Sequence, residues 1–255
     1  MRPLGATEIR ARKGRRFPVI TAYDEPFARL AAQAGIDVLL VGDSLGMVVL
    51  GRPTTVGVDL ADITRATAAV VSGAPAAHVI ADLPFGSYEA SDADAVRAAV
   101  TLVRAGAGSV KLEGGARNAA RVRAIGDAGI PVVGHIGVLP QTAALASGFG
   151  RVVDENRLTD DAEALVAAGV FAIVFEMVDV GVARRLTTAV AVPTIGIGSG
   201  GGCDAQVHVL HDLLGLTAHP PPFAVRTADV ASVARDGLRA YADAVRAGTF
   251  PPERP

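Results

Sequence analysis

The sequence contains a single cysteine, Cys203, among its 255 residues. One cysteine cannot form a disulfide within the chain, and proteins without disulfides are typical of reducing compartments. Cys203 also has no histidine or second cysteine at zinc-ligand spacing, which argues against a zinc site. No apolar stretch is long enough to span a bilayer, and no N-terminal run is typical of a signal peptide. We therefore expect a cytoplasmic protein without a membrane partner.

Charge is also scarce, since only 20% of the residues are charged and the formal net charge is −2. This balance does not favour a nucleic-acid partner, and the one basic cluster, residues 10–16, is interpreted as a solvated face. Half of the residues are hydrophobic, which predicts a compact globular protein with a sizeable core. Lysine occurs only at Lys13 and Lys111, and the other basic residues are arginines. A lysine within the body of the fold therefore calls for a specific explanation.

Short apolar runs recur along the chain, and most are followed by a segment with helical spacing. We expect strands at 19–22, 38–41, 79–81, 110–112, 131–133, 171–175, 193–197 and 207–210. We expect helices at 26–34, 60–71, 93–105, 116–128, 158–168, 182–189 and 230–247. Apolar strands that alternate with helices are typical of parallel sheets with helical cover.

Eight such units in about 250 residues predict a closed (β/α)₈ TIM barrel, an α/β fold, as a single domain over residues 1–255. Segment 1–17 and the proline-rich tail 248–255 are expected to be peripheral. The alternative is an open doubly wound sheet. It is disfavoured because no strand leads into a G-x-G-x-x-G turn and no break in composition divides the chain.

Ionisable and polar side chains gather where the predicted strands end. In a barrel of this type, the chemistry lies at the carboxyl ends of the strands. Any one of these residues could be a helix cap, but caps do not explain a lysine, a histidine and two glutamates. The residues are Asp24, Asp43, Ser44, Asp82, Lys111, Glu113, His135 and Glu176.

Lys111 and Glu113 are two positions apart, so a strand directs both side chains to the same face. Three carboxylates, Asp43, Asp82 and Glu113, end three consecutive strands and are expected to converge. An all-oxygen ligand set favours Mg²⁺. Glu176, in the apolar mouth of the barrel, suits a general acid or base. A glycine-rich segment, GIGSGGG at 196–202, could bind an anion through backbone N–H groups.

These residue types indicate a Mg²⁺-assisted enzyme that acts on a small anionic oxygen compound. A metal that chelates a 2-oxo acid acidifies the carbon beside the ketone, and a carboxylate can remove that proton. The residues alone therefore predict enolate chemistry and leave the electrophile open.

Seven segments of the chain resemble the ketopantoate hydroxymethyltransferase family, of the phosphoenolpyruvate/pyruvate superfamily of barrels. The resemblance extends from about residue 17 to residue 226. It is carried by ITAYD (20–24), AGIDVLLVGDSLGMVVLG (34–51), ADLPFGSYE (81–89), VKLEGG (110–115), PVVGHIGVLPQ (131–141), PTIGIGSG (193–200) and HDLLGL (211–216).

The resemblance implies transfer of a hydroxymethyl group from 5,10-methylenetetrahydrofolate to 3-methyl-2-oxobutanoate, through a metal-stabilised enolate. The product would be 2-dehydropantoate, in pantothenate biosynthesis. It also implies a homodecamer. By motif match, Asp43, Asp82 and Glu113 form the Mg²⁺ site, and Glu176 is the catalytic acid or base. The substrate-binding residues implied are Asp43, Ser44, Asp82, Lys111 and His135.

Three segments depart from the family pattern. A glycine-aromatic-basic run is replaced by SGFGRVVDENR (147–157), a DGQ sequence has Ala205 in place of its glycine, and PPFAVRT (221–227) has Val225 and Thr227 in place of lysine and tyrosine. One alternative is therefore a divergent relative that acts on another 2-oxo acid by aldol or lyase chemistry. Another is a catalytically silent binding subunit, which the intact set of strand-end charges argues against.

Overall fold

The computed structural model describes residues 2–143, 145 and 150–252 of the chain. The chain divides into two compact units, one up to His208 and one from Val209 onward. The single domain over the whole chain stays a prediction, and each unit is described by itself.

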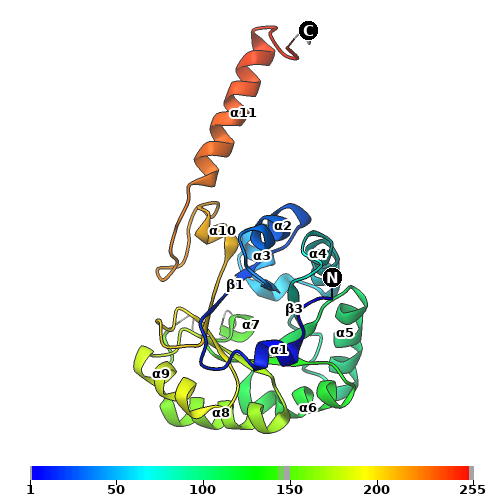
Figure 1. Cartoon of the computed structure of the whole chain (residues 1–255), viewed down its shortest axis with the longest axis vertical. Helices are drawn as coiled ribbons and strands as arrows, with labels where there is room; N and C mark the ends of the chain where they lie inside the picture. Colours follow the sequence, from blue (N-terminus) through cyan, green and yellow to red (C-terminus); the bar gives the residue numbers. More distant parts are fainter. Residues whose placement is uncertain (1, 144, 146–149, 253–255) are drawn as a thin grey trace. The chain divides into compact units, whose positions relative to one another are not determined.

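The first unit is a closed barrel of eight parallel strands, in which each strand pairs with its neighbours in chain order and β8 pairs with β1 (Figure 1). This confirms the predicted (β/α)₈ barrel over the open sheet. The strands are β1 (Phe17–Thr21), β2 (Val38–Val41), β3 (His78–Asp82), β4 (Ser109–Glu113), β5 (Val132–Gly137), β6 (Ala172–Glu176), β7 (Thr194–Ile197) and β8 (Ala205–His208).

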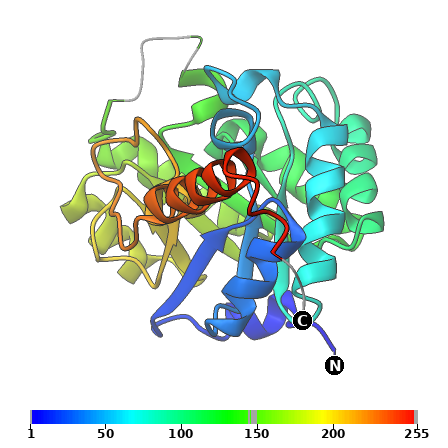
Figure 2. The ribbon, with the colours of Figure 1, turned by 90° about the horizontal axis from the view of Figure 1, so that it is seen from above.

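Helices lie around the outside of the strands (Figures 1 and 2). The longer ones are α2 (Glu25–Gln33), α4 (Leu60–Gly73), α5 (Asp92–Arg104), α6 (Ala119–Asp127), α8 (Glu155–Ala168) and α9 (Val180–Ala189). Most begin at an aspartate or serine whose side chain accepts a hydrogen bond from the first turn, which satisfies an otherwise unpaired N–H group. These caps are Asp24, Asp59, Ser91, Asp154 and Asp179. Short helices are α1 (Ala6–Arg10), α3 (Leu45–Val48), α7 (Pro140–Ala143), η1 (Thr55–Gly57) and η2 (Gly115–Asn118).

Three local features differ from the predictions. β8 spans Ala205–His208, so it begins two residues before the strand predicted at 207–210. The helix predicted at 116–128 is divided into η2 and α6. β5 extends beyond residue 133 to Gly137, so His135 lies within the strand and not after it.

The barrel interior is apolar toward the amino ends of the strands and polar toward their carboxyl ends. Alternate residues of a strand face the same side. Ile80, Val133 and Val174 belong to the apolar core of the barrel. Two residues further along the same strands stand Asp82, His135 and Glu176. The polar side chains therefore form the last layer of the interior.

The N-terminal segment, which was predicted to be peripheral, contributes to this core through Ile9 of α1, whose side chain is fully buried. In the basic cluster that follows, Arg10, Arg15 and Arg16 are exposed, as expected of a solvated face, whereas Arg12 and Lys13 are partly buried. Arg12 forms an ion pair with Asp37, and Lys13 one with Asp204.

The second unit contains α10 (Leu210–Leu213) and α11 (Val230–Arg246). The predicted helix at 230–247 is confirmed by α11, whose first turn is capped by Asp229. None of residues 230–246 is buried, and apolar side chains of this helix are exposed, among them Val233, Leu238 and Tyr241. Across the described ranges, no helix combines the length and the apolar character needed to cross a membrane.

Candidate active site

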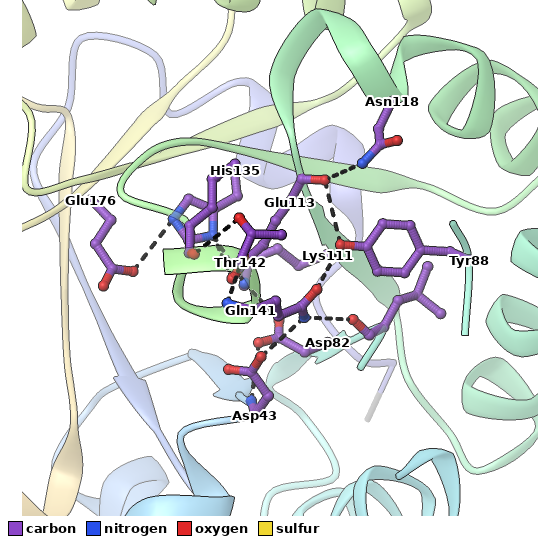
Figure 3. A network of polar contacts seen from close by, with 12 residues as sticks. Asp43, Asp82, Tyr88, Lys111, Glu113, Asn118, His135, Gln141, Thr142 and Glu176 are labelled. Carbon is purple, nitrogen blue, oxygen red and sulfur yellow. Dashed lines mark hydrogen bonds and ion pairs between the residues drawn. The ribbon is translucent and has the colours of Figure 1, made fainter. Parts of the chain in front are cut away.

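Strand register brings the predicted charges together at the carboxyl end of the barrel (Figure 3). Asp82 of β3 lies opposite Lys111 of β4, and the Lys111 ammonium is 3.0 Å from Asp82 Oδ1. Glu113 lies opposite His135 of β5, with 3.4 Å between His135 Nδ1 and Glu113 Oε1. Lys111 and Glu113 are both buried, as their two-residue spacing predicts.

His135 links this group to Glu176 at the end of β6. Its Nε2 is 3.3 Å from Glu176 Oε2, and its Nδ1 is 3.4 Å from the Lys111 ammonium. Burial and the Lys111 charge lower the pKa of His135, but Glu113 and Glu176 outweigh them and raise this pKa to about 9. We therefore expect an imidazolium between two carboxylates at neutral pH.

Asp43 joins the group from the loop after β2, where its backbone N–H donates to Asp82 Oδ2 at 3.1 Å. Both carboxyl groups are buried, which disfavours their charged forms. Burial and the nearby Glu113 carboxylate raise the pKa of Asp43 to about 6. Burial and the Asp43 carboxylate likewise raise the pKa of Asp82 to about 6, against the lowering effect of Lys111.

Two other predicted positions have local roles in the structure. Asp24 caps α2 by accepting a hydrogen bond from the Phe27 N–H, so it acts as a cap. In the glycine-rich segment, the Ser199 hydroxyl donates to the Phe175 carbonyl and accepts from the Val178 N–H. Ser44 stays at the rim, where its hydroxyl is 2.8 Å from the Tyr23 hydroxyl.

Close backbone packing fixes the end of β6. Gly137 has a φ of 101°, and a Cβ at this position would lie 2.1 Å from the Glu176 carbonyl oxygen. Met177, directly after Glu176, has a φ of 50°, in the left-handed region that non-glycine residues rarely adopt. Such a conformation persists only where surrounding contacts hold it. The backbone on both sides of the Glu176 carboxylate is thus tightly constrained.

The residues missed by sequence reasoning are Gln141 of α7 and Tyr88, which follows β3. The Gln141 amide donates to Asp43 Oδ2, and the Tyr88 hydroxyl donates to Gln141 Oε1 (Figure 3). Both residues lie within motifs that carry the family resemblance, but a neutral glutamine in a loop gives no sign of chemistry by itself. Their role depends on chain segments that lie 53 residues apart in sequence.

The charge balance of this buried group fits a divalent cation. Four carboxylates face one ammonium and one imidazolium, which leaves two negative charges uncompensated, and such charges are costly to bury. Among the described residues, Asp82 Oδ1 and Glu113 Oε1 have ion-pair partners, Lys111 and His135, but no well-directed hydrogen bond, so each keeps free acceptor capacity. Within the same residues, no set of three ligand side chains already surrounds one point. The donor chemistry suits Mg²⁺, and the ligands Asp43, Asp82 and Glu113 stay a prediction.

A cavity of about 380 Å³ is lined in part by Glu113 of this group. Two arginines contribute to its wall, and one of them, Arg121, forms an ion pair with Asp92. Its lining residues are Tyr88, Glu89, Glu113, Arg117, Asn118, Arg121 and Thr142.

The fold and the charged rim define a TIM-barrel protein with a buried ionisable site at the carboxyl ends of its strands. The structure of 2,3-dimethylmalate lyase, a member of the PEP mutase/isocitrate lyase superfamily, is similar with a TM-score of 0.64 and 17% identity, over 98% of this chain and 90% of that one. Phosphonopyruvate hydrolase, solved with oxalate and Mg²⁺, gives a TM-score of 0.64 and 14% identity, over 96% and 88%.

Sequence comparison is more specific. The profile of the family described as ketopantoate hydroxymethyltransferase matches residues 5–253. The chain is 52% identical over 253 residues to 3-methyl-2-oxobutanoate hydroxymethyltransferase of Aeropyrum pernix, which covers 97% of this chain and 92% of the relative. The chain belongs to the ketopantoate hydroxymethyltransferase family and is a hydroxymethyltransferase. The predicted resemblance and enzyme class are confirmed.

The departures from the family pattern differ in their surroundings. Val152, in the described part of the first departure, donates its backbone N–H to the carbonyl of Met177, directly after Glu176. Ala205 begins β8, beside Asp204, and Val225 and Thr227 lie in the second unit. Residues 146–149, which include Ser147 of the first departure, are outside the described residues.

Proposed function

We propose that the protein transfers a hydroxymethyl group from 5,10-methylenetetrahydrofolate to 3-methyl-2-oxobutanoate and so forms 2-dehydropantoate, in pantothenate biosynthesis. The observation that carries the proposal is the buried set of carboxylates, lysine and histidine that ends in Glu176. It occurs in a chain 52% identical to an enzyme named for this reaction.

Glu176 removes the proton from C3 of the 2-oxo acid, the carbon beside the ketone. The imidazolium of His135 holds the Glu176 carboxylate in place and stabilises its charge. Water adds to the methylene carbon of the folate, both carbon–nitrogen bonds break, and the water protons pass to the two nitrogens, so that tetrahydrofolate and formaldehyde form. The C3 electron pair attacks the formaldehyde carbon, and the resulting alkoxide takes back the proton held by Glu176 to become the hydroxyl group.

Lys111 and Ser44 bind the carboxylate and the 2-oxo oxygen of the substrate. Lys111 is suited to this role because Asp82, Glu113 and Asp43 outweigh burial and raise its pKa, so that it stays charged. Asp43, Asp82 and Glu113 would hold Mg²⁺, and His135 contributes to substrate placement. Mg²⁺, when bound, supplies Lewis-acid polarisation of the 2-oxo group. The likeness to the Mg²⁺ complex of phosphonopyruvate hydrolase concerns the fold, so the metal proposal rests on the carboxylates of this chain.

The cavity beside Glu113 offers space for the folate, whose glutamate carboxylates suit the Arg117 guanidinium in its wall. The exposed apolar side chains of α11 support an oligomer, as in the predicted homodecamer. The cytoplasmic location stays a prediction.

The proposal is tested by incubating the protein with both substrates and Mg²⁺ and measuring 2-dehydropantoate. Independently, the C3 proton should exchange with D₂O, and Glu176→Gln should lower this exchange by about 10³-fold while 2-oxo acid binding stays within about twofold. Unchanged exchange in Glu176→Gln would reject Glu176 as the base. Absence of product at saturating metal and folate would reject the reaction.

A second candidate is the same chemistry on another 2-oxo acid, which the departures at Ala205, Val225 and Thr227 favour. The exchange assay separates the two when it is run on a panel of 2-oxo acids. If the first proposal is correct, 3-methyl-2-oxobutanoate should show the highest kcat/KM for exchange. A higher value for another 2-oxo acid would support the second candidate.

A further inference from the structure

Gln141 is buried at the centre of the rim although it carries no charge, with 1% of its surface exposed. Its amide nitrogen donates to Asp43 Oδ2 and to the Leu83 carbonyl, both at 3.0 Å. Its backbone N–H donates to Glu113 Oε2 at 3.2 Å. One residue thus contacts two of the three proposed metal ligands and the backbone directly after the third, Asp82.

The orientation of the amide is determined by its partners. Its NH₂ group faces a carboxylate and a carbonyl, which can only accept, and its oxygen accepts from the Tyr88 hydroxyl at 2.6 Å. A flipped amide would direct two acceptors at the Gln141 oxygen and lose these bonds. Tyr88 is itself buried, and its hydroxyl is 3.4 Å from the Glu113 carbonyl. Tyr88, Gln141 and Asp43 therefore form one directed chain of hydrogen bonds.

A carboxylate that is held through one oxygen presents the other oxygen in a defined direction. Groups that orient metal ligands in this way strongly affect metal affinity, although they do not touch the metal. We propose that Gln141, oriented by Tyr88, is a positioning residue that arranges Asp43 and Glu113 for a divalent cation. The inference rests on the proposed function, because it takes these carboxylates as metal ligands.

The test measures cation binding directly, without turnover. Mg²⁺ is titrated calorimetrically into the metal-free protein and into Gln141→Met, which keeps the length of the side chain and removes its donors and acceptor. The Mg²⁺ dissociation constant should rise by about tenfold to 100-fold. At saturating Mg²⁺, kcat should stay within about fivefold of the parent value while the Mg²⁺ activation constant rises.

A matched control separates positioning from general destabilisation. Thr194 is a buried polar residue that hydrogen-bonds Asp204 at the opposite end of the barrel. Thr194→Val should lower the melting temperature and leave the Mg²⁺ dissociation constant unchanged. Tyr88→Phe, which removes only one hydroxyl, should weaken Mg²⁺ by about twofold to tenfold, and little further once Gln141 is methionine.

The outcomes are distinguishable. Parent-like Mg²⁺ affinity in Gln141→Met overturns the inference and leaves the proposed function intact. If Gln141→Met does not fold, parent-like affinity in Tyr88→Phe overturns it. A parent protein that binds no divalent cation overturns both proposals. If Gln141→Met binds Mg²⁺ more weakly than the parent, and the parent makes no 2-dehydropantoate, the inference is supported and the proposed reaction is rejected.

Discussion

The chain has two lysines, and each forms an ion pair with an aspartate at opposite ends of the same barrel. Lys13 pairs with Asp204 at 2.9 Å, and Lys111 pairs with Asp82 at 3.0 Å. Asp204 also accepts hydrogen bonds from the backbone N–H groups of Gly14 and Thr194, so both of its carboxylate oxygens have donors. Asp82 shares its surroundings with a second buried carboxylate, Asp43.

The two aspartates consequently respond in opposite ways. Burial raises the pKa of Asp204, but hydrogen bonds from Lys13, Thr194 and Gly14 outweigh it and hold this pKa below its usual range. Burial and Asp43 raise the pKa of Asp82 to about 6 despite Lys111. Both sites contain a lysine–aspartate ion pair. They differ because Asp204 has additional hydrogen-bond donors, whereas Asp82 has a second carboxylate beside it. A satisfied pair stabilises the fold, whereas an unsatisfied pair is suited to a ligand.

The largest expected difference between the pairs is in activity. Lys111→Met removes the ammonium from a group of four carboxylates, and we expect kcat/KM for the 2-oxo acid to fall by about 10³-fold or more. Lys13→Met should retain kcat/KM within about threefold, because Lys13 lies far from the charged rim in the barrel. Comparable losses in the two variants would contradict the division of roles.

The next effect is an opposite pH dependence, measured by denaturant unfolding of the metal-free protein. The raised pKa of Asp82 means that the folded state binds more protons, so its contribution to stability falls from about pH 4 to about pH 6. The free energy of unfolding of Asp82→Asn, relative to the parent, should therefore rise over this interval. For one such carboxylate the limit is roughly 3 kcal/mol, and coupling to Asp43 reduces it.

At the other end of the barrel the sign is reversed. The lowered pKa of Asp204 contributes stability that is present above its unfolded value of 3.8 and lost as the pH falls. Relative to the parent, Asp204→Asn should therefore gain stability below about pH 4. Equal slopes for the two asparagine variants would show that their surroundings do not differ as described.

The smallest effect is the stability of Asp204→Asn at neutral pH. This change leaves Lys13 without its counter-charge but keeps the shape of the side chain, so we expect a loss of about 2 kcal/mol. Mg²⁺ affinity should not change, as calorimetric titration can check. A variant as stable as the parent would show that the pair at this end is dispensable.

Much of the barrel and its rim followed from the sequence for simple physical reasons. The positions of Asp82, Lys111 and Glu176 near the ends of apolar strands predicted that they lie at the carboxyl end of the barrel. This prediction was possible because the two-residue periodicity of a strand determines the side to which each residue points. The contacts of the N-terminal segment 1–17 were not predicted from the sequence, because the ion pair of Lys13 with Asp204 joins positions 191 residues apart. Gln141 was missed because its importance comes from its neighbours and not from its own chemistry.

Gly137 also has a consequence for how this barrel can change over evolutionary time. Any side chain there would meet the Glu176 carbonyl, and its backbone conformation disfavours other residues. A substitution at position 137 would therefore displace the end of β6, which carries Glu176, whereas segments outside this packing contact can change without moving it.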